Sequence, residues 1–368
     1  MTGAVIRGRG FGVPPSRTQD ELWKGFFRAH HGGDATAAKV WRGAGISRRH
    51  AVIDPCTEDV SSWSTGARMD RYLQEALPLG KEAVSGALAD AGVAPEEVGL
   101  FSVVSCTGYT TPGLDILLAR DLGMSVDVQR LLVGHMGCYA ALPALGAASD
   151  FVVARGRPVV QLCLELCSLH VQPAANLPGA PGPDGRQRHD VGQDDIEQMV
   201  AHALFADAAA ALVLTPDADS VASGAGFGYE VVDVVARTDA TTSDHMSWRI
   251  TDNGFRMGLS PRVPAVLGRH VRPVVSGLLA RHGLALRDVR GWAIHPGGPR
   301  ILDVVGQRLE LTDTDLAPSY EVLRTYGNAS SATVLLVLDQ LEPAPGDHVV
   351  VMAFGPGLTL YAALLRAL

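Results

Sequence analysis

The chain of 368 residues lacks the features of several classes of protein. Charged residues amount to only 19%, and the net charge of −8 argues against nucleic acid as a partner. No apolar run has the length of a membrane span, and the first residues lack a charged region followed by an apolar core. We therefore expect neither membrane association nor secretion. Because 47% apolar residues suffice for a large core, we expect a cytoplasmic enzyme.

A metal-binding pattern is also lacking. The five cysteines form no CxxC pair, and no group of His and Cys has the spacing of a zinc site. Cys163 and Cys167 lie on one strand-like run, but two ligands are too few for a zinc ion. The odd number of cysteines suits reduced, buried thiols. We expect neither a metal nor a redox cofactor.

The run that carries Cys138 is the most informative part of the chain. An apolar run at 131–133 precedes it, Gly137 comes immediately before it, and a stretch rich in Ala and Leu follows at 139–153. This pattern predicts a strand, a sharp turn that glycine permits, and a helix that begins at the cysteine. The start of a helix favours an anion and lowers the pKa of a thiol, so Cys138 is a candidate nucleophile. A buried structural cysteine fits this stretch equally well.

Two later motifs place polar side chains at similar positions. His295 follows the apolar run 292–294 and precedes Pro and Gly residues that turn, and Asn328 precedes an apolar, helix-like stretch at 329–341. Histidine is the usual partner of a nucleophilic thiol, and the N–H groups of His and Asn can bind a developing oxyanion. Taken singly, His295 could be a packed turn residue and Asn328 a helix N-cap.

An internal repeat connects these motifs. Residues 84–94 align with residues 275–285 at an offset of 191 positions, and at this offset Val104 aligns with His295 and Cys138 with Ala329. The repeat predicts two copies of one α/β module, related by a pseudo-twofold axis, whose central helices meet. We expect the halves to be residues 1–225, with the nucleophile, and 226–368, with His and Asn. The three candidate residues should then converge. A Pro- and Gly-rich insertion at 173–195 predicts a long exposed loop.

Four motifs in this order resemble those of a known family. They are Gly137-Cys138, the His-Pro-Gly-Gly-Pro run at 295–299, Tyr-Gly-Asn-Ala-Ser-Ser at 326–331, and Phe-Gly-Pro-Gly-Leu at 354–358. The set resembles type III polyketide synthases, the chalcone synthase-like branch of the thiolase superfamily, over nearly the whole chain. The resemblance implies a thiolase-like duplicated α/β fold with αβαβα layers.

The resemblance also implies roles for the candidate residues. Cys138 would take a starter acyl group from an acyl-CoA, and His295 would keep the thiol ionised and help to bind the thioester carbonyl. Asn328 would join His295 in the oxyanion hole and promote the decarboxylation of malonyl-CoA. The expected partners are these coenzyme A thioesters and a second copy of the chain in a homodimer, and no further cofactor is implied.

Further positions are implied to bind substrates. Phe205 resembles the gatekeeper between a coenzyme A tunnel and the cavity, although it could be an ordinary core aromatic. Thr111 would reach into the cavity of the partner subunit. Arg48 and Arg49 would meet the phosphates of coenzyme A, although a solvated pair fits their sequence equally well.

The remaining implied residues shape the cavity. Cys167, His170 and the region of Pro261 stand where plant members carry Thr, Thr and Phe, while Ser330 is retained. Loss of the aromatic residue near Pro261 would leave room for a longer or differently folded chain. The loop Gly355, Pro356 and Gly357 would form part of the cavity wall.

Other classes of protein stay open on the sequence alone. A ketoacyl synthase or acyltransferase of the thiolase superfamily would use the same residues for a single step. A non-catalytic relative would have lost the candidate residues, which are all present. A cysteine hydrolase would need a carboxylate that orients the histidine, for which Glu165 is a candidate. The starter, the number of extensions and the mode of cyclisation are not defined by the sequence.

Overall fold

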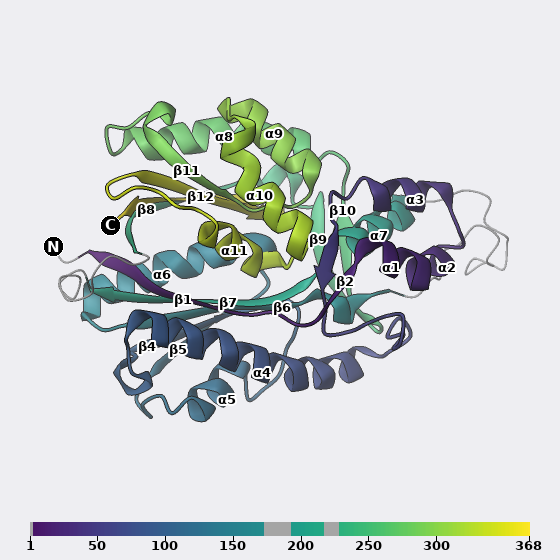
Figure 1. Cartoon of the computed structure of the whole chain (residues 1–368), viewed down its shortest axis with the longest axis horizontal. Helices are drawn as coiled ribbons and strands as arrows, with labels where there is room; N and C mark the ends of the chain where they lie inside the picture. The colour runs from purple at the N-terminus through teal and green to yellow at the C-terminus, as the bar shows by residue number, and fades with distance from the viewer. Residues whose placement is uncertain (1–2, 173–192, 217–227) are drawn as a thin grey trace.

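The computed structural model describes residues 3–172, 193–216 and 228–368 (Figure 1). One nine-stranded mixed sheet dominates it, in the order β11-β12-β13-β8-β1-β7-β6-β4-β5. The strands of this sheet are β1 (Ala4–Gly12), β4 (Leu100–Val104), β5 (Gln129–Val133), β6 (Val159–Leu166), β7 (Asp207–Pro216), β8 (Tyr229–Thr238), β11 (Val289–Ile294), β12 (His348–Gly355) and β13 (Thr359–Ala367).

The sheet consists of two halves that meet between β1 and β8, where only two residue pairs join, Val5 with Glu230 and Ile6 with Tyr229. Outward from this junction, β1, β7, β6 and β4 correspond to β8, β13, β12 and β11. Figure 1 shows the two halves stacked with helices between them. The predicted duplicated, thiolase-like α/β fold is therefore confirmed.

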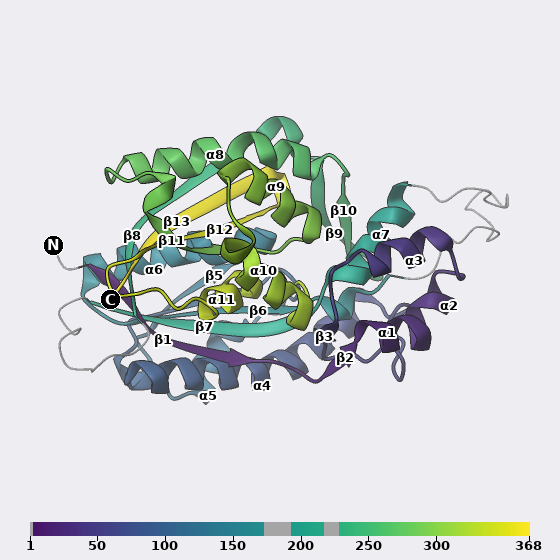
Figure 2. The ribbon, with the colours of Figure 1, turned by 45° about the horizontal axis from the view of Figure 1, so that its top comes forward.

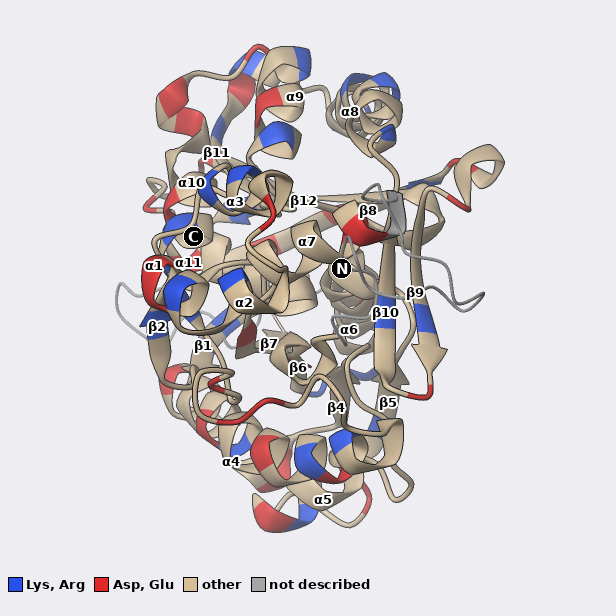
Figure 3. Ribbon diagram, turned by 90° about the vertical axis from the view of Figure 1, so that its right-hand side faces the viewer, with Lys and Arg blue, Asp and Glu red and all other residues tan. Residues whose placement is uncertain are grey.

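Helices complete five layers (Figure 1). Helices α6 and α11 lie between the two halves of the sheet, α4 and α5 cover the outer face of the first half, and α8 and α9 cover the second, with α10 beside them. Their bounds are α4 (Thr65–Ala91), α5 (Leu114–Asp121), α6 (Ala141–Arg155), α8 (Val263–Ala280), α9 (Pro299–Leu309), α10 (Asp313–Tyr326) and α11 (Thr333–Asp339). The outer helices carry both positive and negative side chains (Figure 3).

The apolar composition of the segment 137–155 follows from its place in the middle layer. Among the described residues, Gly137–Arg155 is long and apolar enough to cross a membrane by length and composition alone. Within it α6 buries small and branched side chains, such as Ala144, Leu145 and Ala148, in a core that includes residues of both halves of the sheet. A helix covered on both sides has to be apolar nearly all round, so its composition follows from its place in the core.

A smaller group of elements lies at one end of the layers, on the right in Figures 1 and 2. A hairpin and several short helices and strands form it, and we call it the cap. They are β2 (Ser16–Thr18), α1 (Gln19–Leu22), η1 (Trp23–Phe27), α2 (Arg28–His30), α3 (Ala35–Arg42), β3 (Arg48–His50), α7 (Gln193–Leu204), β9 (Met246–Thr251) and β10 (Gly254–Leu259).

The two halves differ in places. At the register of the repeat, strand β5 of the first half corresponds to part of helix α10 in the second half. The prediction of a long loop over 173–195 is wrong for its last three residues, because α7 begins at Gln193. The rest of that loop, and the predicted boundary between residues 225 and 226, lie outside the described residues.

Candidate active site

Cys138 lies in a short 3-10 turn, η3 (Gly137–Tyr139), between the end of β5 and the start of α6. Gly137 has a φ of 72°, and a Cβ atom built on it would lie 2.7 Å from Cδ of Pro356. Glycine is therefore needed both for the backbone conformation and for the close packing. The turn buries Cys138, whose relative exposure is 8%.

The loop of Gly355, Pro356 and Gly357 packs against this turn. A Cβ atom on Gly355 would lie 3.0 Å from Cδ1 of Tyr139 and 3.3 Å from the backbone nitrogen of Cys138. The loop that ends β12 therefore supports the backbone of the candidate nucleophile. Its contribution to a cavity wall stays a prediction.

Asn328 follows α10, after Gly327 with a φ of 82°. Its Oδ1 accepts a hydrogen bond from the backbone N–H of Ser330 at 2.9 Å, which leaves its NH₂ group to donate to a ligand. The Ser330 hydroxyl in turn donates to Sγ of Cys138 at 3.5 Å. Ser330 has a φ of 48°, a strained conformation for a residue other than glycine.

His295 follows β11 and is almost wholly buried. Its backbone N–H donates to Met352 O of the neighbouring β12 at 2.8 Å, and its ring packs edge to face on Phe354 with centroids 5.7 Å apart. Phe354 precedes Gly355, which packs on Cys138. The structure thus joins Asn328 to Cys138 through Ser330 and brings His295 to the loop that supports Cys138.

Burial controls the protonation of the pair. It raises the pKa of the Cys138 thiol to about 12 and lowers the pKa of His295 to about 3. Both shifts favour the neutral forms, because an apolar surrounding disfavours charge. Two expectations are therefore wrong for the free enzyme: that the helix start lowers the thiol pKa, and that His295 keeps the thiol ionised. Desolvation outweighs the helix terminus and keeps both groups neutral.

A buried carboxyl group lies beside the nucleophile. Glu165 on β6 accepts hydrogen bonds from the hydroxyls of Ser331 at 2.6 Å and Thr107 at 2.8 Å, and from the backbone N–H of Cys106 at 3.0 Å. Burial raises the pKa of this carboxyl. Nδ1 of His295 has no hydrogen-bond partner among the described residues, so Glu165 does not orient the histidine as a hydrolase would require.

Cys106, Thr107 and Ser331 lie at this site but were not among the residues predicted from the sequence. Cys106 Sγ lies 3.7 Å from Oγ of Ser330, so a second thiol stands next to the group that contacts Cys138. A signal for it was present, because Cys106 follows the strand that the repeat aligns with the strand before His295.

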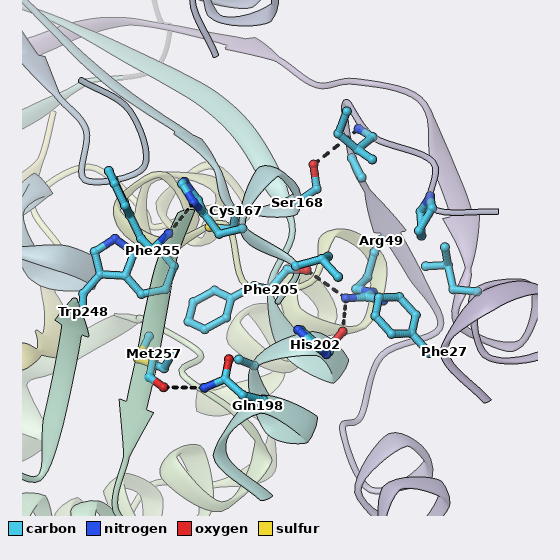
Figure 4. Close-up of a pocket in the computed structure, with 17 residues that line it drawn as sticks. Phe27, Arg49, Cys167, Ser168, Gln198, His202, Phe205, Trp248, Phe255 and Met257 are labelled. Atoms are coloured by element: carbon cyan, nitrogen blue, oxygen red, sulfur yellow. Dashed lines mark hydrogen bonds between the residues drawn. The ribbon is translucent and has the colours of Figure 1, made fainter. Parts of the chain in front are cut away.

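A pocket lies between the cap and the layers (Figure 4). Phe205 stands in its middle, with Trp248, Phe255 and Met257 on one side and Arg49 on the other. Trp248 Nε1 donates to the carbonyl of Cys106 at 2.8 Å, which connects the aromatic side to the residues around Cys138. The lining residues are Leu22, Phe27, Arg49, Ala51, Ile53, Pro55, Cys167, Ser168, His170, Val171, Gln198, Ala201, His202, Phe205, Trp248, Phe255 and Met257.

His170 and Cys167 line this pocket, and their contact with substrate stays a prediction. His170 Nε2 lies 2.7 Å from Thr107 O and its Nδ1 accepts from Phe255 N–H at 3.0 Å, so both ring nitrogens are occupied. Burial lowers its pKa to about 3, and its ring stacks on Phe255 at 4.4 Å. Pro261 is exposed and is not among the lining residues, whereas Phe255 lines the pocket. Whether an aromatic residue is lost near Pro261 stays a prediction.

The two arginines of β3 have different surroundings. Arg48 is exposed and donates to Ser16 Oγ at 3.0 Å. Arg49 is only 6% exposed and donates to the carbonyls of His202 at 2.6 Å and Phe205 at 2.9 Å. The expectation that Arg49 meets a phosphate of coenzyme A is wrong, because its guanidinium is buried against the backbone. For Arg48 it stays a prediction.

Thr111 lies on the surface after β4, with its hydroxyl 3.5 Å from that of Tyr109, which is 69% exposed. The adjacent β5 forms the outer edge of the sheet and exposes Leu131 and Leu132. Apolar side chains on a sheet edge are unusual in a free monomer. Within the described residues no group of three His, Cys, Asp or Glu side chains is placed to hold a metal ion.

A buried thiol, an imidazole and an amide, supplied by the two halves of a duplicated five-layered α/β fold, define a condensing enzyme of the thiolase type. Two family models, described as the N-terminal and C-terminal domains of chalcone and stilbene synthases, match residues 50–183 and 234–368. The chain is 34% identical over 343 residues to 1,3,6,8-tetrahydroxynaphthalene synthase of Streptomyces peucetius subsp. caesius, covering 90% of this chain and 84% of that enzyme.

Other similar proteins point to the same family. An alpha-pyrone synthesis polyketide synthase-like protein of Mycobacterium tuberculosis, Pks18, is 31% identical, covering 89% of this chain and 81% of that protein. The crystal structure of PKS-I of the brown alga Ectocarpus siliculosus superposes with a TM-score of 0.87 at 27% identity, covering 100% of this chain and 99% of that one. The chain therefore belongs to the chalcone and stilbene synthase family and is a type III polyketide synthase, an acyl-transferring enzyme that condenses malonyl-CoA units.

Proposed function

We propose that this synthase loads an acyl group from an acyl-CoA starter onto Cys138 and extends it with malonyl-CoA. The extended chain then cyclises to a small aromatic or pyrone product. The observation that supports these site assignments best is the bond from Ser330 to Cys138, since Asn328 holds Ser330. This bond supports the proposal because it brings Cys138 of the first half next to the segment of the second half that carries Asn328.

Loading requires the Cys138 proton to leave as sulfur attacks. His295, which is neutral in the buried site, accepts this proton while Sγ bonds to the thioester carbonyl carbon. The carbonyl oxygen becomes an oxyanion, which the protonated His295 holds. The bond to the coenzyme A sulfur then breaks, and coenzyme A leaves as a thiol with the proton from His295.

Extension uses His295 again and adds Asn328 as a second donor. The bond between the malonyl carboxylate and its α-carbon breaks, CO₂ leaves, and the electron pair remains as an enolate whose oxygen Asn328 and His295 hold. The α-carbon attacks the acyl carbonyl on Cys138, and the cysteine sulfur leaves as a thiolate, which takes up a proton from solvent. The longer chain is now a coenzyme A thioester and can return to Cys138 for another cycle.

We propose that this pocket receives the growing chain. Its aromatic end is lined by Trp248, Phe255 and Met257, which exclude water from reactive intermediates. We propose that Phe205 separates this end from the coenzyme A arm and that Arg48, exposed on the cap, meets the phosphates. No cofactor besides the coenzyme A thioesters takes part in these steps.

We also propose a homodimer in the cytoplasm. The exposed edge strand β5, with Leu131 and Leu132, and the neighbouring loop of Thr111 supply an apolar face for a second copy. In this arrangement Thr111 reaches the cavity of the partner.

Intact-protein mass spectrometry tests the proposal. The protein and its Cys138→Ala variant are mixed with a panel of acyl-CoAs, first alone and then with malonyl-CoA. An acyl adduct on wild type that is absent from the variant, followed by released polyketide, supports it and identifies the starter. An adduct that yields only a single condensation product favours a one-step ketoacyl synthase, and no adduct with any thioester contradicts the assignment of Cys138.

A further inference from the structure

Arg49 is a buried cation that the proposed chemistry does not use. Its guanidinium lies 5.6 Å from the ring centroid of Phe27 and 5.0 Å from that of Trp41. Burial lowers its pKa to about 10, so it remains charged at neutral pH. No carboxylate forms an ion pair with it among the described residues, although Asp207 contributes a favourable field. Such a costly placement needs compensation from hydrogen bonds.

Part of the compensation comes from the end of α7, while Arg49 Nε has no hydrogen-bond partner among the described residues. Arg49 Nη1 donates to the carbonyl oxygens of His202, in the last turn, and of Phe205, the residue after the helix (Figure 4). The last carbonyls of a helix lack partners within it and carry its negative dipole end, so a cation is favoured there. Arg49 therefore fixes the backbone from which the Phe205 ring projects into the pocket.

The stem of Arg49 touches a second segment. A Cβ atom built on Gly327 would lie 3.1 Å from Cγ of Arg49 and 2.9 Å from Cβ of Ala206. Gly327 immediately precedes Asn328. The Arg49 side chain thus packs against Gly327, the residue whose backbone conformation sets the position of Asn328.

These two segments are themselves paired. The backbone N–H of Asn328 donates to Leu204 O at 2.9 Å, and the N–H of Ala206 donates to Asn328 O at 2.9 Å, an isolated bridge between Phe205 and Asn328. A bridge of one residue has little rigidity of its own. Arg49 contacts both of its sides, through the guanidinium on one and the stem on the other.

We propose that Arg49 is a positioning residue that holds the bridge between Phe205 and Asn328 in place. The inference rests on the oxyanion role proposed for Asn328. Without the guanidinium, the carbonyls of His202 and Phe205 lose their donor and the bridge shifts. The Asn328 NH₂ group then moves away from the enolate oxygen, whereas the turn that carries Cys138, which packs on the Gly355 loop, stays in place.

The test compares two steps in Arg49→Lys and Arg49→Met. One is acylation of Cys138 by the starter that wild type accepts, followed by intact mass, and the other is CO₂ release from malonyl-CoA. Removal of an oxyanion donor lowers kcat by about 10²–10³, and we expect displacement of Asn328 to lower decarboxylation by at least about tenfold. Acylation should change by less than about threefold.

Arg68 offers a matched control. It too is a fully buried arginine, with a pKa that burial lowers to about 10, and it donates only to backbone carbonyls, those of Val60, Ser61, Trp63, Leu169 and Val171. Arg68→Lys should lower Tm as Arg49→Lys does and leave the ratio of decarboxylation to acylation unchanged. An equal change of this ratio in both variants would overturn the proposal.

Two further measurements separate positioning from other roles. In an Asn328→Ala background, Arg49→Lys should cause no additional loss of decarboxylation, and a full additional loss would contradict the coupling. A raised KM for both thioesters with unchanged kcat would instead assign Arg49 to coenzyme A binding and overturn the proposal. If the Arg49 variants do not fold, Gly327→Ala disturbs the same contact from the other side and should show the same selective loss.

The failures of the two proposals are distinguishable. If wild type acquires no acyl adduct on Cys138, the proposed function fails before any variant is compared. If wild type is acylated and the ratio is the same in all variants, only the role of Arg49 fails.

Discussion

The hydroxyl of Ser330 donates to Sγ of Cys138 at 3.5 Å, although 192 residues separate the two. Ser330 comes from the turn that precedes the central helix of the second half, and Cys138 from the corresponding turn of the first. The pseudo-twofold arrangement therefore produces a shared site at which each half supplies what the other lacks.

Replacing Ser330 by Ala removes this bond. Since a hydrogen bond of this kind contributes about 0.5–1.5 kcal/mol, acylation of Cys138 should slow by about twofold to tenfold in single-turnover measurements. Ser331→Ala is the control, because its hydroxyl donates to Glu165 and not to Cys138. That variant should lose stability while its acylation slows less. Equal slowing in both would contradict a specific role for Ser330.

The free thiol of Cys138 should be less reactive than an ordinary cysteine. Burial raises its pKa to about 12, and below its pKa the thiolate fraction increases tenfold for each pH unit. The rate of alkylation of Cys138 by iodoacetamide, followed by peptide mass spectrometry, should therefore rise steadily from pH 6 to pH 9. Exposed Cys56 serves as the internal reference. A plateau near neutral pH would show that a thiolate–imidazolium pair forms before substrate binds.

The cap should lose stability in mild acid because it buries three histidines in ring contact. Centroids are 5.3 Å apart for His30 with His202 and for His31 with His202. Burial lowers the pKa of His31 to about 4 and lowers those of the other two. Between the unfolded value of about 6.5 and the folded value, only the unfolded chain binds the proton, so stability falls as pH falls.

The size of this effect is measurable. Between its folded and unfolded pKa values, each such histidine lowers the free energy of unfolding by about 1.4 kcal/mol for each pH unit of acidification. The urea midpoint should therefore drop between pH 7.5 and pH 5. His31→Gln, which cannot be protonated, should make this dependence shallower by about one proton. An unchanged pH dependence in that variant would contradict the burial of a neutral His31.

Gly137→Ala should damage the turn that carries Cys138. A side chain there meets both an unfavourable φ of 72° and the ring of Pro356 at 2.7 Å. Gly156 is a control, because its φ is 62° and nothing lies within 4 Å of an added Cβ atom. Gly156→Ala should cost about 1 kcal/mol in thermal unfolding and keep acylation, whereas Gly137→Ala should cost more and abolish most of it. Equal losses in both variants would rule out the contact with Pro356 as the cause.

A charge on the exposed edge of the sheet should separate the proposed dimer. Leu132 on β5 is 50% exposed, and Val126, in the turn that leads to β5, is 99% exposed. Light scattering coupled to size-exclusion chromatography should find a smaller mass for Leu132→Arg and an unchanged mass for Val126→Arg. A dimer that survives Leu132→Arg would place the interface elsewhere.

The amino-acid sequence is sufficient to predict the parts of this protein that depend on local pattern. The elbow before Cys138 follows from a glycine between an apolar run and an Ala-rich stretch, because glycine adopts a positive φ without strain. The internal repeat predicts the duplicated layers, since each module has an apolar face that only the other can cover. The family motifs are likewise contained in the order of residues along nearly the whole chain.

The environment of each group, in contrast, depends on tertiary packing. Neighbours far away in the chain determine the pKa of Cys138 and the burial of Arg49 beside an exposed Arg48. They also supply the hydrogen bond that the Glu165 carboxyl accepts from the backbone N–H of Cys106. Phe255 lines the pocket from the hairpin of β9 and β10, which tertiary packing places beside Cys167 and His170. Desolvation and hydrogen bonding act through space, so residues adjacent in sequence can differ in charge, exposure and role.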